Sequence, residues 1–143
     1  MFSIAITAQV LLLLYHQITT LVDFYPFNNV RPYTIKERLL ECGVNGVLMT
    51  LPPVGFALHI KWAMNASLLV YPALLLGEYL NWWHPYLFSP TKTWSNTYQR
   101  LFRHTIIVLP PIRNNPVPNL EHCILHGITL ITTVCTYIYF FSA

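Results

Sequence analysis

Four apolar stretches, each close to the length that crosses a lipid bilayer, dominate the sequence. They cover residues 2–22, 41–60, 63–81 and 120–141. A membrane-spanning helix needs about 20 mostly apolar residues. These stretches take up more than half of the 143 residues, so little is left from which to build a soluble domain. The sequence therefore predicts an all-α integral membrane protein, a four-transmembrane-helix bundle that forms one membrane domain over residues 1–143.

The composition argues against several other classes of protein. Charged residues make up 9% of the chain and hydrophobic residues 55%, whereas an ordinary soluble domain carries about 25% charged residues. The net charge of +3 is scattered along the chain, unlike the clustered basic stripe of a nucleic-acid-binding protein. The three cysteines form no Cys-x-x-Cys motif, which argues against a thiol–disulfide oxidoreductase.

The positive charges predict how the bundle is oriented. Seven Lys and Arg residues fall in the two loops that follow the first and third stretches, and only Lys61 falls on the opposite side. Short cytoplasmic loops are enriched in Lys and Arg. We therefore expect a protein of the plasma (inner) membrane, with both termini outside and both long loops in the cytoplasm. The seven residues are Arg31, Lys36, Arg38, Lys92, Arg100, Arg103 and Arg113.

The second long loop contains the pattern of an amphipathic helix over residues 90–108. Ser89 is a good N-cap residue, and Pro90 suits the first helical position. Large apolar side chains then recur at helical spacing, with polar residues on the other face, which favours a helix in the membrane interface. Packing against another subunit is the alternative for its apolar face. The apolar residues include Trp94, Tyr98, Leu101 and Phe102.

Two capping signals mark helix starts beside the spans. Thr34 and Glu37 have the spacing of a capping box, which predicts a helix that begins there and runs into the second span. Asn119 is a good N-cap for the fourth span, and Glu121 in its first turn interacts favourably with the helix dipole.

Polar residues line one face of each span. At about 1.5 Å per residue, His16 lies roughly 9 Å and His126 roughly 10 Å inside the cytoplasmic ends of their spans. Polar groups in hydrocarbon are costly and usually face the bundle interior or water. We therefore expect a polar layer near the cytoplasmic face, formed by His16, Asn45, Glu78, His122 and His126.

This layer has two kinds of chemistry available to it. His122 and His126 lie one helical turn apart, a spacing that can chelate a transition metal, with His16 as a third ligand. A transition metal is therefore the candidate cofactor. Glu78, His126 and His122 are also candidate catalytic residues for proton transfer. The candidate ligand-binding residues are His16, Asn45, Asn81 and Arg113.

Three functions fit these residues. The first is an accessory membrane protein that binds a small or lipid-like ligand in the polar layer. The alternative is a membrane-embedded enzyme that acts on a lipid-phase substrate through a His/Glu or metal site. A weaker alternative is proton or ion transport, since few polar residues continue to the outer face. Polar residues can also serve only as hydrogen bonds between helices, each worth about 1 kcal/mol or less. The expected partners are the lipid bilayer and a homo-oligomer or larger membrane complex, and no nucleic acid.

Overall fold

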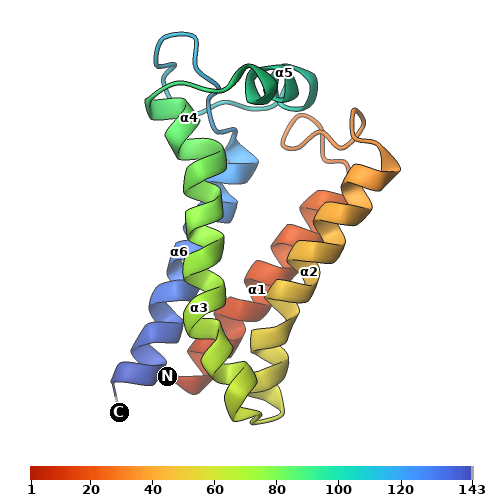
Figure 1. Ribbon diagram of the computed structural model, residues 1–143. Coiled ribbons are helices and arrows are strands. Elements are labelled where there is room, and N and C mark those ends of the chain that lie inside the picture. The colour runs from red at the N-terminus through yellow and green to blue at the C-terminus, as the bar shows by residue number, and fades with distance from the viewer. Residues whose placement is uncertain (143) are drawn as a thin grey trace.

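The computed structural model describes residues 1–142, and four of its helices are long and apolar enough to cross a membrane (Figure 1). These helices confirm the predicted four-helix bundle. A π-helical turn and a short helix continue the third of them, and one further helix lies in the long loop that follows. In chain order the elements are α1 (Phe2–Leu21), α2 (Ile35–Ala57), α3 (Lys61–Glu78), η1 (Tyr79–Trp83), α4 (His84–Leu87), α5 (Lys92–Leu101) and α6 (Leu120–Phe141).

The four long helices form a closed ring. Helices α1 and α3 each pack against both α2 and α6. Helices α2 and α3 meet at the short turn that joins them and diverge toward the other end of the bundle (Figure 1). Gly55 permits the close approach at the turn, because a Cβ atom there would lie 2.6 Å from Cβ of Ala63 and 2.8 Å from the backbone nitrogen of Met64.

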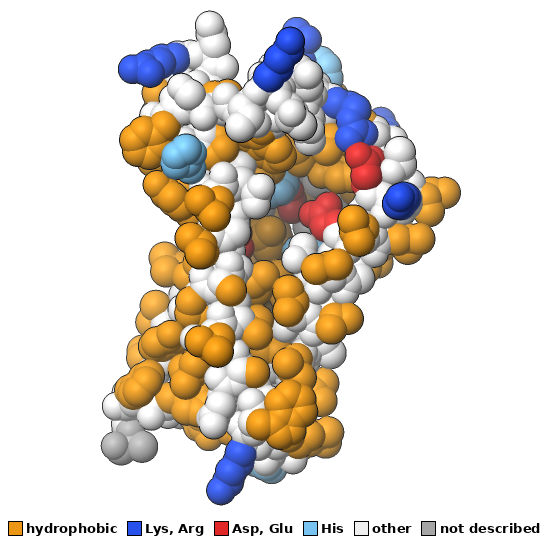
Figure 2. Space-filling model, in the orientation of Figure 1, with side chains coloured by type: hydrophobic (Ala, Val, Ile, Leu, Met, Phe, Trp, Pro, Cys, Tyr) orange, Lys and Arg blue, Asp and Glu red, His pale blue; other side chains and the backbone are white. Residues whose placement is uncertain are grey.

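The two ends of the bundle differ in what they carry. The loop of residues 22–34, the loop of residues 88–119 and α5 lie at one end, and both chain termini lie at the other (Figure 1). Lys61, the first residue of α3, lies at the end that holds the termini. The other seven Lys and Arg residues lie in or beside the two long loops, at the opposite end. The space-filling view shows an apolar band between these two charged ends (Figure 2).

Helix α2 begins at Ile35, and its capping box of Thr34 and Glu37 is formed, which confirms the predicted helix start. Three other boundaries differ from the sequence expectations. Helix α2 ends at Ala57 rather than residue 60. The third span continues past residue 81 to Leu87 through η1 and α4. Helix α5 is shorter than the predicted 90–108. Its N-cap is Thr91 instead of Ser89, and it ends at Leu101, before a turn in which the Thr105 N–H bonds the Phe102 carbonyl.

Helix α5 lies across the end of the bundle, and its apolar side chains are turned inward. Tyr98, Leu101 and Phe102 are buried with Trp82 of η1, and Trp94 packs against the same cluster. The predicted amphipathic pattern is therefore present, and its apolar face packs on the chain's own spanning helices. Helix α5 covers the loop end of the bundle.

Apolar packing and hydrogen bonds between helices hold the half of the bundle nearer the termini. Phe56, Met64 and Ala5 form one buried cluster there. Gln9 Nε2 donates to Thr136 Oγ1 at 3.2 Å, and Thr132 Oγ1 donates to the carbonyl of Ala8 at 3.1 Å. These bonds join α1 to α6, so the polar residues in this half act as links between helices.

Candidate functional site

A cavity of about 460 Å³ lies between α2 and α3, beneath α5. Figure 2 shows the molecule hollowed at this position, with acidic and histidine side chains visible inside. Each spanning helix contributes to the wall. Helices α2 and α3 supply its two sides, and α1 and α6 its back. Its ionisable and amide side chains on the spanning helices include His16, Glu41, Asn45, Glu78, Asn81, His122 and His126.

The structure brings most of the predicted site residues to this one cavity. His16, Asn45, Glu78, His122 and His126, which the sequence predicts as one layer, all line it, and so does Asn81. Arg113 is the exception. It is exposed in the loop before α6 and lies outside the lining of the cavity.

Four residues that line the cavity carry a buried polar atom without a hydrogen-bond partner among residues 1–142. The atoms are His16 Nδ1, Glu78 Oε2, Trp94 Nε1 and His126 Nε2. A buried polar group without a partner costs about 1–3 kcal/mol. Buried polar groups in proteins are nearly always satisfied, by the protein or by what it binds. The cavity therefore has unused hydrogen-bonding capacity concentrated on its wall.

Hydrogen bonds from neighbouring helices position two of these groups. Thr129 Oγ1 of α6 donates to Glu78 Oε1 at 2.6 Å, which leaves Oε2 as the free carboxylate oxygen. His16 Nε2 lies 3.3 Å from Asn45 Nδ2 of α2. His16 and His126 are almost fully buried, with 3% and 6% of their surface exposed. These side chains therefore have few alternative positions.

The π-helical turn η1 supplies two consecutive tryptophans that contact the two histidines of α6. The Trp82 ring packs on His122, with ring centroids 4.0 Å apart. Trp83 Nε1 donates to His126 Nδ1 at 3.0 Å. Single turns of π-helix inside α-helices are frequent at functional sites. The histidines are thus held from α3 as well as from their own helix.

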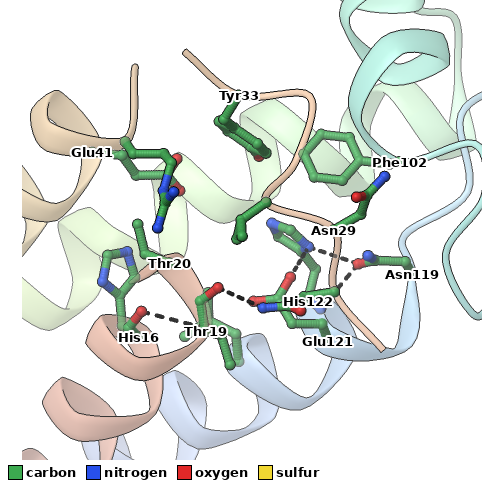
Figure 3. A pocket seen from close by; sticks show the side chains of 14 residues that line it. His16, Thr19, Thr20, Asn29, Tyr33, Glu41, Phe102, Asn119, Glu121 and His122 are labelled. Carbon is green, nitrogen blue, oxygen red and sulfur yellow. Dashed lines mark hydrogen bonds and ion pairs between the residues drawn. The ribbon is translucent and has the colours of Figure 1, made fainter. Parts of the chain in front are cut away.

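A second, smaller cavity of about 30 Å³ adjoins the first on the side of α1 and α6 (Figure 3). His16, Glu41 and His122 line both cavities. In the smaller one, Glu121 Oε2 lies 2.7 Å from His122 Nδ1, and Asn119 Oδ1 lies 2.6 Å from the same nitrogen. A water molecule needs about 10–15 Å³ of such space, so this polar compartment has room for water beside the contact of Glu121 with His122.

Tyr33, in the loop before α2, also lines both cavities. Burial raises the pKa of its phenol, and the nearby carboxylates of Glu41 and Glu121 act in the same direction. The hydroxyl of Tyr33 therefore stays protonated at neutral pH and is available as a hydrogen-bond donor.

The predicted set of three metal-ligating histidines does not come together. Within residues 1–142, no group of three or more His, Cys, Asp and Glu side chains is placed to hold a metal ion. Hydrogen bonds already occupy one ring nitrogen of His126 and one of His122. His126 Nδ1 accepts from Trp83, and His122 Nδ1 is paired with Glu121. Each of these two rings therefore has one nitrogen already committed within the protein.

Several residues of the site were not predicted from the sequence as part of it, among them Glu121, Trp83 and Trp94. From the sequence, Glu121 in the first turn of α6 was expected to interact with the helix dipole. Trp83 is typical of the aromatic residues at a membrane interface, and Trp94 belongs to the amphipathic pattern of the loop. All three instead contact or line the polar layer. The available signal was the adjacency of Glu121 to His122, because a carboxylate and an imidazole near the end of one span can pair.

Comparison of the chain with protein-family models, with curated proteins and with solved structures gave no match. The function is therefore inferred from the cavity itself.

Proposed function

We propose that this protein binds a small amphipathic molecule from the lipid phase in the cavity between α2 and α3. The observation that carries the proposal is the set of four buried, unpartnered polar atoms on the cavity wall, contributed by His16, Glu78, Trp94 and His126. A ligand with a polar head group would satisfy these atoms.

The surroundings of the cavity favour a ligand that is partly apolar. Met49, Leu74 and Leu125 line the cavity beside its polar residues. Exposed apolar side chains continue along the two helices that form its sides, including Val47 on α2 and Leu80 on α3. Helix α5 covers the end of the bundle, so access from the bilayer between α2 and α3 is the direct route. The apolar part of the ligand would leave the cavity along these side chains.

The cavity belongs to the cytoplasmic half of the membrane in this proposal. It lies at the end of the bundle that carries the two long loops, and seven of the eight Lys and Arg residues follow these loops. Because positive charge is retained on the cytoplasmic side, the loops are proposed to be cytoplasmic, in a plasma (inner) membrane, with both termini outside.

Copurification of a bound molecule tests the proposal. Gly77 lines the cavity, and a Cβ atom there meets no atom within 4 Å. Gly77→Leu therefore introduces an apolar side chain at the cavity wall at a position where its Cβ meets no neighbouring atom. Gly127→Leu is the matched control, because a Cβ at Gly127 on α6 also meets no atom within 4 Å and Gly127 lies outside the cavity lining.

Native mass spectrometry and lipid extraction of the purified proteins would measure the bound molecule. We expect a ligand in stoichiometric amount on the wild type and on Gly127→Leu, and its loss from Gly77→Leu. Equal ligand content in the three proteins would contradict the proposal.

An enzyme acting on the same ligand is the second candidate. The observation that favours it is the presence of an unpaired carboxylate oxygen of Glu78 and an unpaired imidazole nitrogen of His126 in one cavity, because such groups can transfer protons. Glu78→Gln keeps the size of the side chain and an acceptor for Thr129. If the protein is an enzyme, this variant retains a molecule that differs in mass from the one on the wild type. If it is a binding protein, the two molecules are identical.

A further inference from the structure

We infer that the ligand of the α2–α3 cavity carries a positively charged amine in its head group, recognised by the carboxylates of Glu41 and Glu78. The inference rests on the proposed binding function and adds the chemical class of the ligand, an amphipathic amine. Glu41 belongs to α2 and Glu78 to α3, the two helices that form the sides of the cavity, and both residues line it. Acidic side chains are visible inside the hollow in Figure 2.

The two carboxylates have no counter-charge in the protein. Within residues 1–142, neither Glu41 nor Glu78 forms an ion pair, and no Lys or Arg is among the residues that line this cavity. Arg38, one turn before Glu41 on α2, lines only the smaller cavity and donates to the carbonyl of Leu21. Buried charges in proteins are normally paired. An ammonium group in the cavity supplies the missing positive charge, whereas a phosphate or carboxylate would meet like charge.

Glu78 offers a specific contact atom for the ammonium group. Thr129 Oγ1 donates to Glu78 Oε1 at 2.6 Å, and Glu78 Oε2 is buried without a partner among residues 1–142. A hydrogen bond between an ammonium N–H and a carboxylate is roughly twice as strong as one between neutral groups. The free oxygen therefore favours an ammonium donor over a neutral donor of the same size.

The histidines of the wall do not balance the charge of the two glutamates. His126 Nδ1 lies 3.0 Å from the indole N–H of Trp83, which can only donate, so Nδ1 carries no proton and the ring is neutral. His122 Nδ1 lies 2.7 Å from a carboxylate oxygen of Glu121. Whether His122 is protonated or neutral, it carries no net positive charge together with Glu121.

His16, the third histidine of the wall, also faces a donor. Its Nε2 lies 3.3 Å from the amide nitrogen Nδ2 of Asn45, which opposes a second proton on the ring. Its Nδ1 and the Nε2 atom of His126 are buried without a partner among residues 1–142, and the two residues are only 3% and 6% exposed. These atoms indicate that a polar occupant completes the cavity, and the glutamates determine the sign of its charge.

The remaining features of the cavity are compatible with a cation. Trp82, Trp94 and Phe102 line it, and the faces of aromatic rings attract ammonium groups. The unpartnered N–H groups of the wall are neutral and need only an oxygen atom as acceptor. A cavity of about 460 Å³ has room for water beside a head group, because one water needs about 10–15 Å³. Water can satisfy these donors, but it cannot neutralise the carboxylates.

Three probes that share one C16 chain and differ in the charge of the head group test the inference. They are hexadecylamine, hexadecan-1-ol and palmitate, and a simple amine is protonated at pH 7, as lysine is. Trp82 and Trp94 line the cavity and Trp83 contacts His126, whereas Trp62 is exposed near the opposite end of α3. The full-length Trp62→Phe protein in nanodiscs of zwitterionic lipid therefore reports binding through tryptophan fluorescence.

Two variants and one matched control are made in this background. Glu78→Gln and Glu41→Gln each remove one carboxylate from the cavity and keep the size of the side chain. Asp23→Asn removes one carboxylate at the same end of the bundle, from a residue that lines neither cavity and pairs with Arg31. It therefore corrects for any general effect of charge on the uptake of the probes by the membrane.

We expect hexadecylamine to bind about 10- to 100-fold more tightly than hexadecan-1-ol, the range of one hydrogen bond to a charged group, and palmitate to bind most weakly. Glu78→Gln should reduce the preference for the amine over the alcohol by about tenfold. Glu41→Gln should also reduce it, and Asp23→Asn should leave it unchanged. Binding of the alcohol should be similar in all these proteins, which checks that the cavity is folded.

Three results would overturn the assignment of a cationic head group. They are binding of the alcohol or of palmitate at least as tight as that of the amine, an unchanged preference in both Glu78→Gln and Glu41→Gln, and an equal loss of preference in Asp23→Asn. Equal affinity for the three probes would overturn the assignment and leave the proposed binding function standing. Absence of any signal would also overturn it, and the ligand content of Gly77→Leu and Gly127→Leu would then decide separately whether the cavity binds another molecule.

Discussion

Arg100 binds both carboxylate oxygens of Glu37, with nitrogen–oxygen distances of 2.6 and 3.3 Å. The same guanidinium donates to the carbonyl of Pro32 at 2.9 Å. One side chain thus joins α5 to the first turn of α2 and to the loop before it. Because α5 covers the cavity, this ion pair restrains α5 in its position over the cavity.

Replacing Arg100 with Gln should loosen α5 without unfolding the bundle. The pair is partly exposed, with 44% and 40% of the two side chains accessible, and exposed ion pairs add little to global stability. We expect faster amide hydrogen exchange in residues 92–101 and unchanged exchange in α6. Arg103→Gln, also exposed in the same loop, is the control and should leave both segments unchanged. Equal exchange in residues 92–101 of the two variants would show that the ion pair does not restrain α5.

Two glycines of α2 should respond in opposite directions to replacement with Ala. A Cβ at Gly55 would lie within 2.8 Å of backbone atoms of α3, whereas a Cβ at Gly43 meets no atom within 4 Å. We expect Gly55→Ala to destabilise the protein by about 1–3 kcal/mol through overpacking. Gly43→Ala should be neutral or stabilise it by up to about 1 kcal/mol through higher helix propensity. Thermal unfolding in detergent measures both, and a stable Gly55→Ala protein would contradict the close packing of α2 and α3.

Removing the Asn119 side chain should destabilise the start of α6. This side chain is fully buried, accepts from the His122 N–H at 3.1 Å and donates to Thr105 Oγ1 at 3.0 Å. Asn119→Ala removes the cap and leaves buried partners unsatisfied, with an expected cost of about 2 kcal/mol.

Thermal unfolding of three proteins checks this expectation. Asn119→Ser keeps a capping oxygen and loses the amide donor, so it should fall between wild type and Asn119→Ala. Asn96→Ala, at an exposed position on α5, should unfold like the wild type. An Asn119→Ala protein as stable as the wild type would show that the cap is dispensable.

The two histidines of α6 should show different tautomers in ¹⁵N NMR spectra at a pH where both are neutral. The proton of His126 should be on Nε2, because Trp83 donates to Nδ1, and the proton of His122 should be on Nδ1. Trp83→Phe removes the donor and should allow His126 to populate both tautomers, while Trp62→Phe should change neither ring. A proton on Nδ1 of His126 in the wild type would refute the hydrogen bond from Trp83.

Cysteine labelling should place both long loops on the cytoplasmic side. Lys36 and Lys92 are exposed at the loop end, and Lys61 is exposed at the end that holds the termini. After the native Cys42, Cys123 and Cys135 are removed, a single Cys at position 36 or 92 should react with an impermeant maleimide only in opened membranes. A Cys at position 61 should react in intact cells. The reverse pattern would invert the proposed orientation.

The architecture followed from the sequence because hydrophobic length and capping are local properties. Four apolar stretches predicted the four spans, and the capping box at Thr34 and Glu37 fixed the start of α2. The matching depths of His16, Glu78 and His126 also predicted that these residues share one layer, and all three line the cavity between α2 and α3. Their role in binding or catalysis stays a prediction.

The remaining features depend on how helices rotate against one another, which a single sequence does not encode locally. The extra residue per turn in η1 brings Trp83 to His126, and nothing in the order of residues 79–83 marks it. The pairing of Glu121 with His122 likewise depends on side-chain directions at the start of α6. The metal set failed for the same reason, since equal depth does not make three imidazoles converge.

Gly55 lies at one end of α2, and the α2 residues that line the cavity lie toward the other end. A small change in the angle between α2 and α3 at Gly55 is therefore enlarged at the cavity. Residues 41 and 55 are about 20 Å apart along the helix axis. A change of about 5° in the crossing angle at Gly55 would therefore move Glu41 by about 2 Å relative to α3. A residue far from the cavity, Gly55, thus influences the distance between the two sides of the cavity. Selectivity for thicker or thinner molecules can evolve through small residues at the opposite membrane surface, while the polar groups of the cavity stay unchanged.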